Sequence, residues 1–185
     1  TLTTFFIGHG SFASSPLTDE YFNNTFSITL MQLENMVLTE FPVFPLTAQK
    51  MIDFRMPYHN LINPLTAEDF EQFPVLSRLS LYQCGMTVFP DVSPLADTLT
   101  SLILNRNKFT SVLPGVFTGF SKLTSLTMNE NPLETFPQLS NSSLGLLQLD
   151  LGITQLNSTT CSNFEIFDQL TSLKMGNNKL ESDVW

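Results

Sequence analysis

The stretch LTSLILNRNKF at residues 99–109 decides how this chain folds. Its apolar residues stand at the first, fourth, sixth and eleventh positions, and an asparagine stands at the ninth. The same form recurs from Leu123 and from Leu170. Looser copies begin at Leu2, Ile28, Met51, Leu76 and Leu146. Self-similarity at a period of about 20 to 50 residues is the signature of a repeat architecture. Eight such starts, 23 to 26 residues apart, carry the repeat along the whole chain.

The apolar columns of this repeat are complete. All eight copies keep an apolar residue at positions one, four, six and eleven, although only 42% of the chain is hydrophobic. The ninth column reads Gly10, Met36, His59, Cys84, Asn107, Asn131, Thr154 and Asn178. An asparagine amide there can bond backbone groups of neighbouring coils and so form a ladder. We expect a weaker ladder in the first three repeats, where asparagine is missing.

A second period lies inside the first. Even-numbered repeats carry Phe-Pro at one offset, at residues 41–42, 89–90 and 136–137. Odd-numbered repeats place aromatics later, as Phe70 with Phe73, Phe117 with Phe120, and Phe164 with Phe167. We expect these phenylalanines to fill the wide side of each coil, and the prolines to fix the turn that leaves the strand.

The form LxxLxLxxNxL resembles the leucine-rich-repeat family over the full chain. The repeat from Leu99 to Lys122 is similar to the "typical" subclass of extracellular receptors and matrix proteins, with Leu113-Pro114, Phe117 and Phe120 in the matching places. The resemblance implies an α/β solenoid, a right-handed curved coil with one parallel sheet of short strands on its concave face. Its convex side would be mostly irregular or 3-10. Residues 1–185 would form one domain without recognisable caps, ending in an incomplete repeat.

Composition narrows the class of partner. Seventeen acids against eight bases give a net charge of −9, which argues against nucleic acid or anionic lipid as the main partner. No apolar run approaches the ~20 residues that span a bilayer. The chain opens on Thr1 without a signal peptide, so we expect a mature or excised segment. Sequons at Asn23, Asn141 and Asn157 all fall outside the strands, which favours a glycosylated, secreted or cell-surface protein, although any one of them could arise by chance.

No catalytic residues, cofactor site or metal site are expected. Gly8-His9-Gly10 begins a relaxed dinucleotide pattern, but Ser14-Ser15-Pro16 follows where the motif needs a helix. Neither histidine has a cysteine or carboxylate at ligand spacing, and no strained-turn nucleophile motif occurs. His59 and Cys84 occupy the ladder column, where a structural role is expected. Cys161 lies three coils beyond Cys84, about 14 Å away at strand spacing, too far for a disulfide.

Strand alternation predicts which residues face a partner. Positions three, five, seven and eight should line the concave face. Its bases are balanced there by Glu34, Asp53, Glu130 and Asp150, and a mixture of arginine and tyrosine is typical of protein-binding surfaces. The same residues could also be merely solvated strand positions. The predicted binding residues are Arg55, Tyr58, Arg78, Tyr82, Ile103, Arg106, Asp150 and Lys174.

The ends of the chain offer a second function. Leu2, Phe5 and Ile7 at one end, and Leu180 and Trp185 at the other, lack polar caps. Each such apolar side chain left in water would cost roughly 1.5–3 kcal/mol. We expect the ends to be covered, either by more of a longer chain or by the next subunit. Head-to-tail stacking would build a filament. The alternatives are therefore a partner-binding receptor or matrix module and a building block of an extracellular glycoprotein filament or coat.

Overall fold

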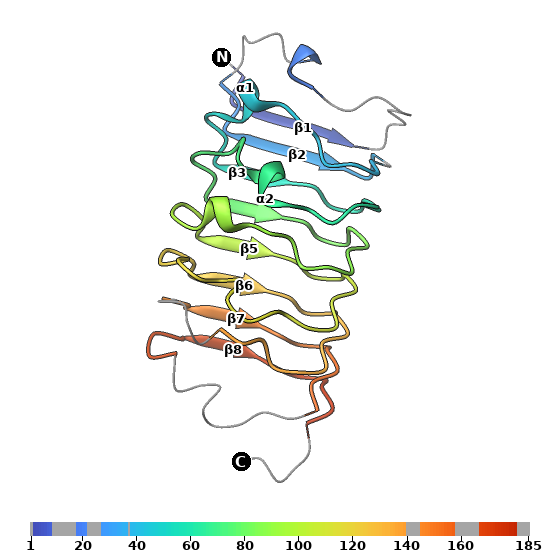
Figure 1. Ribbon diagram of the computed structural model, residues 1–185, viewed down its shortest axis with the longest axis vertical. Coiled ribbons are helices and arrows are strands. Elements are labelled where there is room, and N and C mark those ends of the chain that lie inside the picture. The colour runs from blue at the N-terminus through green and yellow to red at the C-terminus, as the bar shows by residue number, and fades with distance from the viewer. Residues whose placement is uncertain are drawn as a thin grey trace.

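The computed structural model describes residues 2–8, 18–21, 27–36, 38–139, 145–157 and 167–180. The chain winds into a solenoid in which successive coils each add one strand to a single sheet (Figure 1). Eight strands follow in chain order, and each pairs in parallel with the next. They are β1 (Thr4–Gly8), β2 (Leu30–Glu34), β3 (Asp53–Arg55), β4 (Arg78–Ser80), β5 (Ser101–Ile103), β6 (Ser125–Thr127), β7 (Gln148–Asp150) and β8 (Ser172–Lys174). The predicted parallel-sheet solenoid is confirmed.

The strands pair at equal positions of the repeat. Leu79 lies opposite Leu102, and Leu102 lies opposite Leu126, so the fourth-position column runs straight through the molecule. The second-position carbonyl of each coil holds the next coil with two backbone bonds. For example, Ser77 O accepts the N–H groups of Thr100 and Ser101 at 2.8 and 3.1 Å. This register sends the fourth-position side chains into the core and the third- and fifth-position side chains outward.

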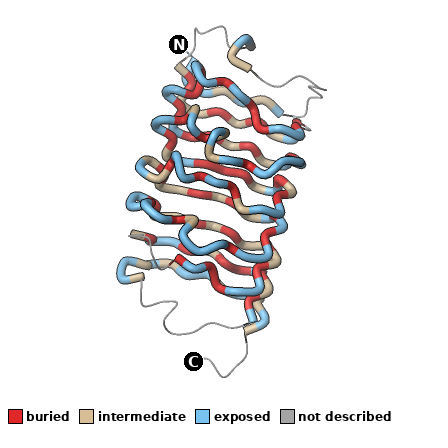
Figure 2. Tube along the Cα trace, viewed as in Figure 1, coloured by how far each residue is buried: buried red, intermediate tan, exposed pale blue. Residues whose placement is uncertain are grey.

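Buried residues recur in every inner coil between exposed ones (Figure 2). The fourth-position residues of the six inner coils are all buried, whereas Phe5 of the first coil is only partly buried and Leu173 of the last is 40% exposed. Phenylalanines fill the space behind the sheet in two clusters. In one, Phe41 packs against Phe70 with ring centroids 5.3 Å apart. The other joins Phe89 to Phe117 at 5.5 Å. Each cluster links an even coil to the following odd coil, as the pairwise period predicts.

Short helical turns make up the regular part of the other side. They are η1 (Asp19–Tyr21), α1 (Pro45–Ala48), α2 (Ala67–Phe70) and η2 (Ser93–Leu95). Asp19 caps α1, because its carboxylate accepts the backbone N–H groups of Leu46 and Thr47, each at 2.8 Å. Thr66 and Asp69 form a capping box on α2. These brief elements agree with the expected irregular or 3-10 character of this side.

The ninth-position side chains form a ladder through the molecule. Asn107 donates to Leu81 O at 2.9 Å and accepts the N–H groups of Cys84 and Met86 at 3.0 and 3.1 Å. The ladder reaches further toward the N-terminus than the asparagines do. Cys84 Sγ donates to Met56 O at 2.9 Å, and His59 Nε2 lies 2.8 Å from Leu33 O, each on the sixth-position carbonyl of the preceding coil.

The expected weakening at His59 holds in part. Its imidazole N–H reaches the same acceptor as an amide N–H, but Nδ1 is buried without a hydrogen-bond partner among the described residues, so the two acceptor bonds that Asn107 makes are missing. Met36 is buried and has no side-chain N–H or S–H to donate, so the expectation stands at that coil. Burial lowers the pKa of His59 and raises the pKa of the Cys84 thiol to about 12. Cys84 is a free thiol, as expected. Gly10, Cys161 and Phe164 lie outside the described residues.

Candidate functional site

The side of the sheet that looks away from the core, which we call the outer sheet face, ends in an unusual turn. At the eighth position of each described inner coil, and of the last, the backbone is left-handed although the residue is not glycine. The residues are Asn35, Tyr58, Gln83, Arg106, Glu130, Ile153 and Asn177, with φ between 51° and 63°. A left-handed residue with a side chain costs roughly 1–2 kcal/mol, so the surrounding structure must impose this conformation.

In the six inner coils, a backbone bond to the next coil holds this conformation. The eighth-position N–H donates to the seventh-position carbonyl of the next coil, as in Tyr58 N to Tyr82 O at 3.0 Å and Arg106 N to Asn129 O at 3.1 Å. The turn therefore projects its side chain along one edge of the outer sheet face in every coil. Asn35 and Asn177 hinted at this conformation, since asparagine adopts it more readily than most other non-glycine residues, but the bulkier members of the column hid the pattern.

Along this edge, side chains from four successive coils form a continuous row. The rings of Tyr58 and Tyr82 meet edge to face with centroids 5.2 Å apart. The guanidinium carbon of Arg106 lies 5.5 Å from the Tyr82 ring centroid, within cation–π range. Arg106 Nε also contacts Glu130 Oε2 at 2.8 Å, and this hydrogen bond raises the pKa of Arg106. We call Tyr58, Tyr82, Arg106 and Glu130 the aromatic row.

Beside the row lies a basic cluster built on one carboxylate. Arg55 forms two bonds to Asp53, from Nε to Oδ1 at 2.9 Å and from Nη2 to Oδ2 at 2.6 Å. Arg78 Nε lies 3.2 Å from the same Oδ2. The Asp53 side chain is only 4% exposed. Asp53 leaves the outer sheet face as expected, but it is not open to solvent there, because the two guanidinium groups cover it. We call Asp53, Arg55 and Arg78 the arginine anchor.

The C-terminal part of the face is more open. Lys174 Nζ lies 3.7 Å from Asp150 Oδ2, and Asp150 Oδ1 accepts the Gly152 N–H at 3.0 Å. A shallow hollow of about 460 Å³ lies here, between the ends of β7 and β8 and the turns that follow them. The hollow forms because the seventh position of both coils is glycine, at Gly152 and Gly176, and no side chain fills the space there. Ile103 lies half-buried in the middle of the face, on β5.

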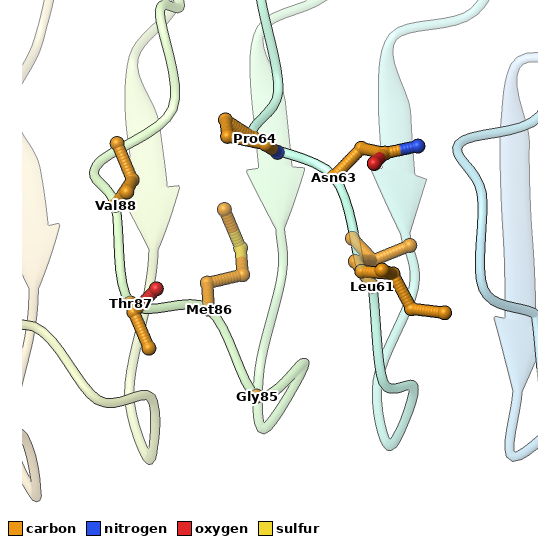
Figure 3. A pocket seen from close by; sticks show the side chains of 8 residues that line it. Leu61, Asn63, Pro64, Gly85, Met86, Thr87 and Val88 are labelled. Carbon is orange, nitrogen blue, oxygen red and sulfur yellow. The ribbon is translucent and has the colours of Figure 1, made fainter.

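A smaller hollow of about 50 Å³ lies off the sheet, between the third and fourth coils (Figure 3). It is lined by residues 61–64 and 85–88 and contains no charged side chain. Gly85 allows the two coils to approach here, because its φ is +70° and a Cβ would lie 2.7 Å from Asn60 Oδ1. The hollow is a consequence of coil packing and has no chemistry of its own.

Seven of the eight predicted binding residues fall into three groups, and Ile103 stands apart from them on β5. Arg55 and Arg78 meet at the arginine anchor, Tyr58, Tyr82 and Arg106 form most of the aromatic row, and Asp150 pairs with Lys174. Of the predicted glycosylation sites, Asn157 is exposed beyond β7. Of the predicted end residues, Leu2 is 43% exposed, and Phe5, Ile7 and Leu180 are partly buried. Asn23, Asn141 and Trp185 lie outside the described residues.

The described ranges contain neither a candidate metal site nor a candidate membrane span. In that part of the chain, no three His, Cys, Asp or Glu side chains gather where they could hold a metal ion. The helices found there are too short and too polar to cross a membrane.

Two comparisons with known proteins found a similarity. Residues 97–156 match the family model described as leucine rich repeat. No curated protein matches the sequence. Among solved structures, a leucine-rich-repeat protein of Leptospira interrogans is similar, with 17% identity and a TM-score of 0.42 over 98% of this chain. The chain spans 62% of the length of that structure. The family match covers the central residues 97–156, and the parallel-sheet solenoid continues through the described coils on either side of it.

Proposed function

We propose that this solenoid is a non-catalytic extracellular module that binds a protein partner on its outer sheet face. The observation that carries the proposal is the aromatic row. Tyrosine and arginine are enriched among the residues that dominate binding energies, and here each is held by a neighbour before any partner arrives. Tyr58 is 42% exposed while its ring is fixed against Tyr82. Side chains that are already ordered lose less conformational entropy on binding.

The remaining groups on the face would add specificity. Ile103 offers an apolar surface on β5, in the same coil as Arg106 of the aromatic row. The Asp150–Lys174 pair is exposed at the lysine, so it would contribute little energy and would favour one orientation of the partner. The arginine anchor would bind polar groups, as argued further below.

The extracellular setting rests on the sequons. We propose N-linked glycans on at least two of Asn23, Asn141 and Asn157. Asn157 supports this placement because it is exposed and follows the turn that leaves β7, away from the outer sheet face. The mass of native protein before and after enzymatic deglycosylation tests the proposal. A mass equal to that of the bare polypeptide would contradict it.

A glycan placed as an obstacle tests the binding face itself. Ser101→Asn with Ile103→Thr creates a sequon on β5, in the middle of the outer sheet face. Ser111→Asn with Leu113→Thr creates the matched sequon in the same coil, at residues that are exposed off the sheet. Both pairs exchange a serine and an aliphatic residue. Both variants are expressed in a glycosylating host and tested against peptides selected from a random library on the unmodified protein. The first variant should lose binding to these peptides, and the second should keep it. Equal binding by both variants would contradict the proposal.

A second candidate is head-to-tail assembly into an extracellular filament or coat. One observation favours it, namely that Leu173 on β8 is 40% exposed, whereas the same column is buried in the inner coils. A second copy stacking on β8 would bury it. Light scattering should then show a mass that rises with concentration, and Leu173→Lys should abolish the rise. A mass that stays monomeric at high concentration would contradict this candidate.

A further inference from the structure

We propose that the arginine anchor binds a carboxylate side chain of the partner, and that the Tyr58–Tyr82 pair receives an apolar or aromatic side chain next to it. The inference rests on the proposed binding role of the outer sheet face and adds the chemistry of what binds there. The partner segment would carry an aspartate or glutamate close to an apolar residue.

Strand register builds the anchor. Asp53 opens β3, and Arg55 follows two residues later, so both side chains leave the same face of the sheet. The pairing of β3 with β4 places Arg78 opposite Asp53. The carboxylate therefore lies between two guanidinium groups from neighbouring coils, with contacts of 2.6 to 3.2 Å.

The charges of the cluster do not cancel. Two cations share one anion, and the anion is the buried member. The side chains of Arg55 and Arg78 are 43% and 58% exposed, against 4% for Asp53. A molecule approaching this part of the face therefore meets guanidinium groups and a net positive charge of one.

The guanidinium groups also keep donors to spare. Asp53 occupies Nε and Nη2 of Arg55 and faces Nε of Arg78, and no other hydrogen bond to either group occurs among the described residues. Glu34, at the end of the neighbouring β2, does not compete. Its Oε2 accepts a bond from Gln32 Nε2 at 3.0 Å, and in the described part of the chain it pairs with neither arginine. The free N–H groups suit a second carboxylate, since arginine binds carboxylates through paired donors.

The surroundings favour a single carboxylate over a polyanion. The anchor carries one excess positive charge in a chain whose net charge is −9. A nucleic acid or a sulfated polysaccharide would meet the acids of the chain on every side. One side-chain carboxylate matches the local charge and adds little repulsion elsewhere.

The tyrosine pair borders the anchor and supplies the apolar half of the site. Tyr58 stands three residues after Arg55, in the left-handed turn that follows β3. Its ring is packed on Tyr82, and Arg106 holds Tyr82 from the next coil. A partner residue adjacent to the bound carboxylate would therefore lie on a fixed aromatic surface.

Selection from a library of random short peptides on the immobilised full chain tests the inference. The recovered peptides should carry Asp or Glu close to an apolar or aromatic residue. Replacing that acid by its amide should weaken binding at least about tenfold, because a hydrogen bond to a charged group is lost. Arg78→Gln should weaken the acidic peptide by a similar factor and leave the amide peptide unchanged, which isolates the pairwise interaction. Lys122→Gln, which removes an exposed cation that lies off the sheet, is the matched control and should have no effect.

Arg78→Gln is the main variant because Asp53 keeps both bonds from Arg55, and a circular dichroism spectrum checks that it folds. Two failures can be told apart. Peptides that lose binding with Tyr82→Ala but ignore Arg78→Gln and show no need for an acid would overturn this inference and leave the proposed function in place. Peptides indifferent to both substitutions, or the recovery of no peptide, would overturn both.

Discussion

Asn107→Ala is the substitution that most sharply probes how the coils are held together. The Asn107 amide donates to Leu81 O at 2.9 Å and to Leu104 O at 3.0 Å, and accepts from Cys84 N at 3.0 Å and Met86 N at 3.1 Å. The site is buried, so water cannot replace these bonds. At a net value of about 1 kcal/mol per bond, the alanine variant should lose about 4 kcal/mol of unfolding free energy. That is a large part of the stability of an ordinary domain.

Asn105→Ala is the matched control. Asn105 precedes Asn107 by two residues in the same coil, and its side-chain Oδ1 is buried without a hydrogen-bond partner among the described residues. Removing this amide breaks no bond, so the free energy of unfolding should change by no more than about 0.5 kcal/mol. Urea unfolding measures both values. Native-state hydrogen exchange adds a local readout, because the Cys84 and Met86 amides should lose protection only in the Asn107 variant. Equal destabilisation by the two variants, or unchanged protection of these amides, would refute a stabilising role of the ladder between coils.

Three further predictions concern two members of the ladder, His59 and Cys84, and the glycine that follows Cys84. Burial lowers the pKa of His59, so as pH falls the unfolded chain takes up a proton there before the folded chain does. The free energy of unfolding should therefore be full above the unfolded pKa of about 6.5 and should decline as pH falls through it. His59→Asn, which installs the ladder amide, should remove that decline in urea midpoints measured against pH. The Cys84 thiol, with its pKa raised to about 12, should resist iodoacetamide at pH 8 in the folded protein and react once urea unfolds it. Peptide mapping separates it from Cys161, and rapid alkylation of Cys84 itself in the native protein would show that the coil opens there. Gly85→Ala should lose more unfolding free energy than Gly115→Ala. Both glycines have positive φ and cost roughly 1–2 kcal/mol as alanine, but only at Gly85 would the new Cβ meet a close atom, Asn60 Oδ1 at 2.7 Å. Equal losses would contradict this reading.

The sequence predicted the fold because the repeat columns fix a register. Once the apolar residues recur in phase, the parallel sheet, its outward positions and the two-coil phenylalanine clusters follow from strand alternation and coil stacking. Arg55, Tyr58, Arg78, Tyr82 and Arg106 could be assigned to one face for this reason.

The contacts between side chains within that face could not be predicted from the sequence. Burial of Asp53 depends on which rotamers the two flanking arginines adopt, and nothing in the repeat pattern specifies them. The left-handed eighth position is imposed by a backbone bond to the next coil, so it admits Tyr58 or Ile153 as readily as Asn35. The bond from His59 to the preceding coil was concealed because the ladder requires a donor at that place and not one particular residue type.

The central claim is that the outer sheet face between β3 and β6 binds a partner. An experimental structure of the protein bound to a peptide from the library selection tests it most directly. We expect the peptide to lie across β3, β4 and β5, with a carboxylate on Arg55 and Arg78 and an apolar side chain on Tyr58. A peptide bound at the ends of the solenoid, or on the side that carries α1 and α2, would contradict it.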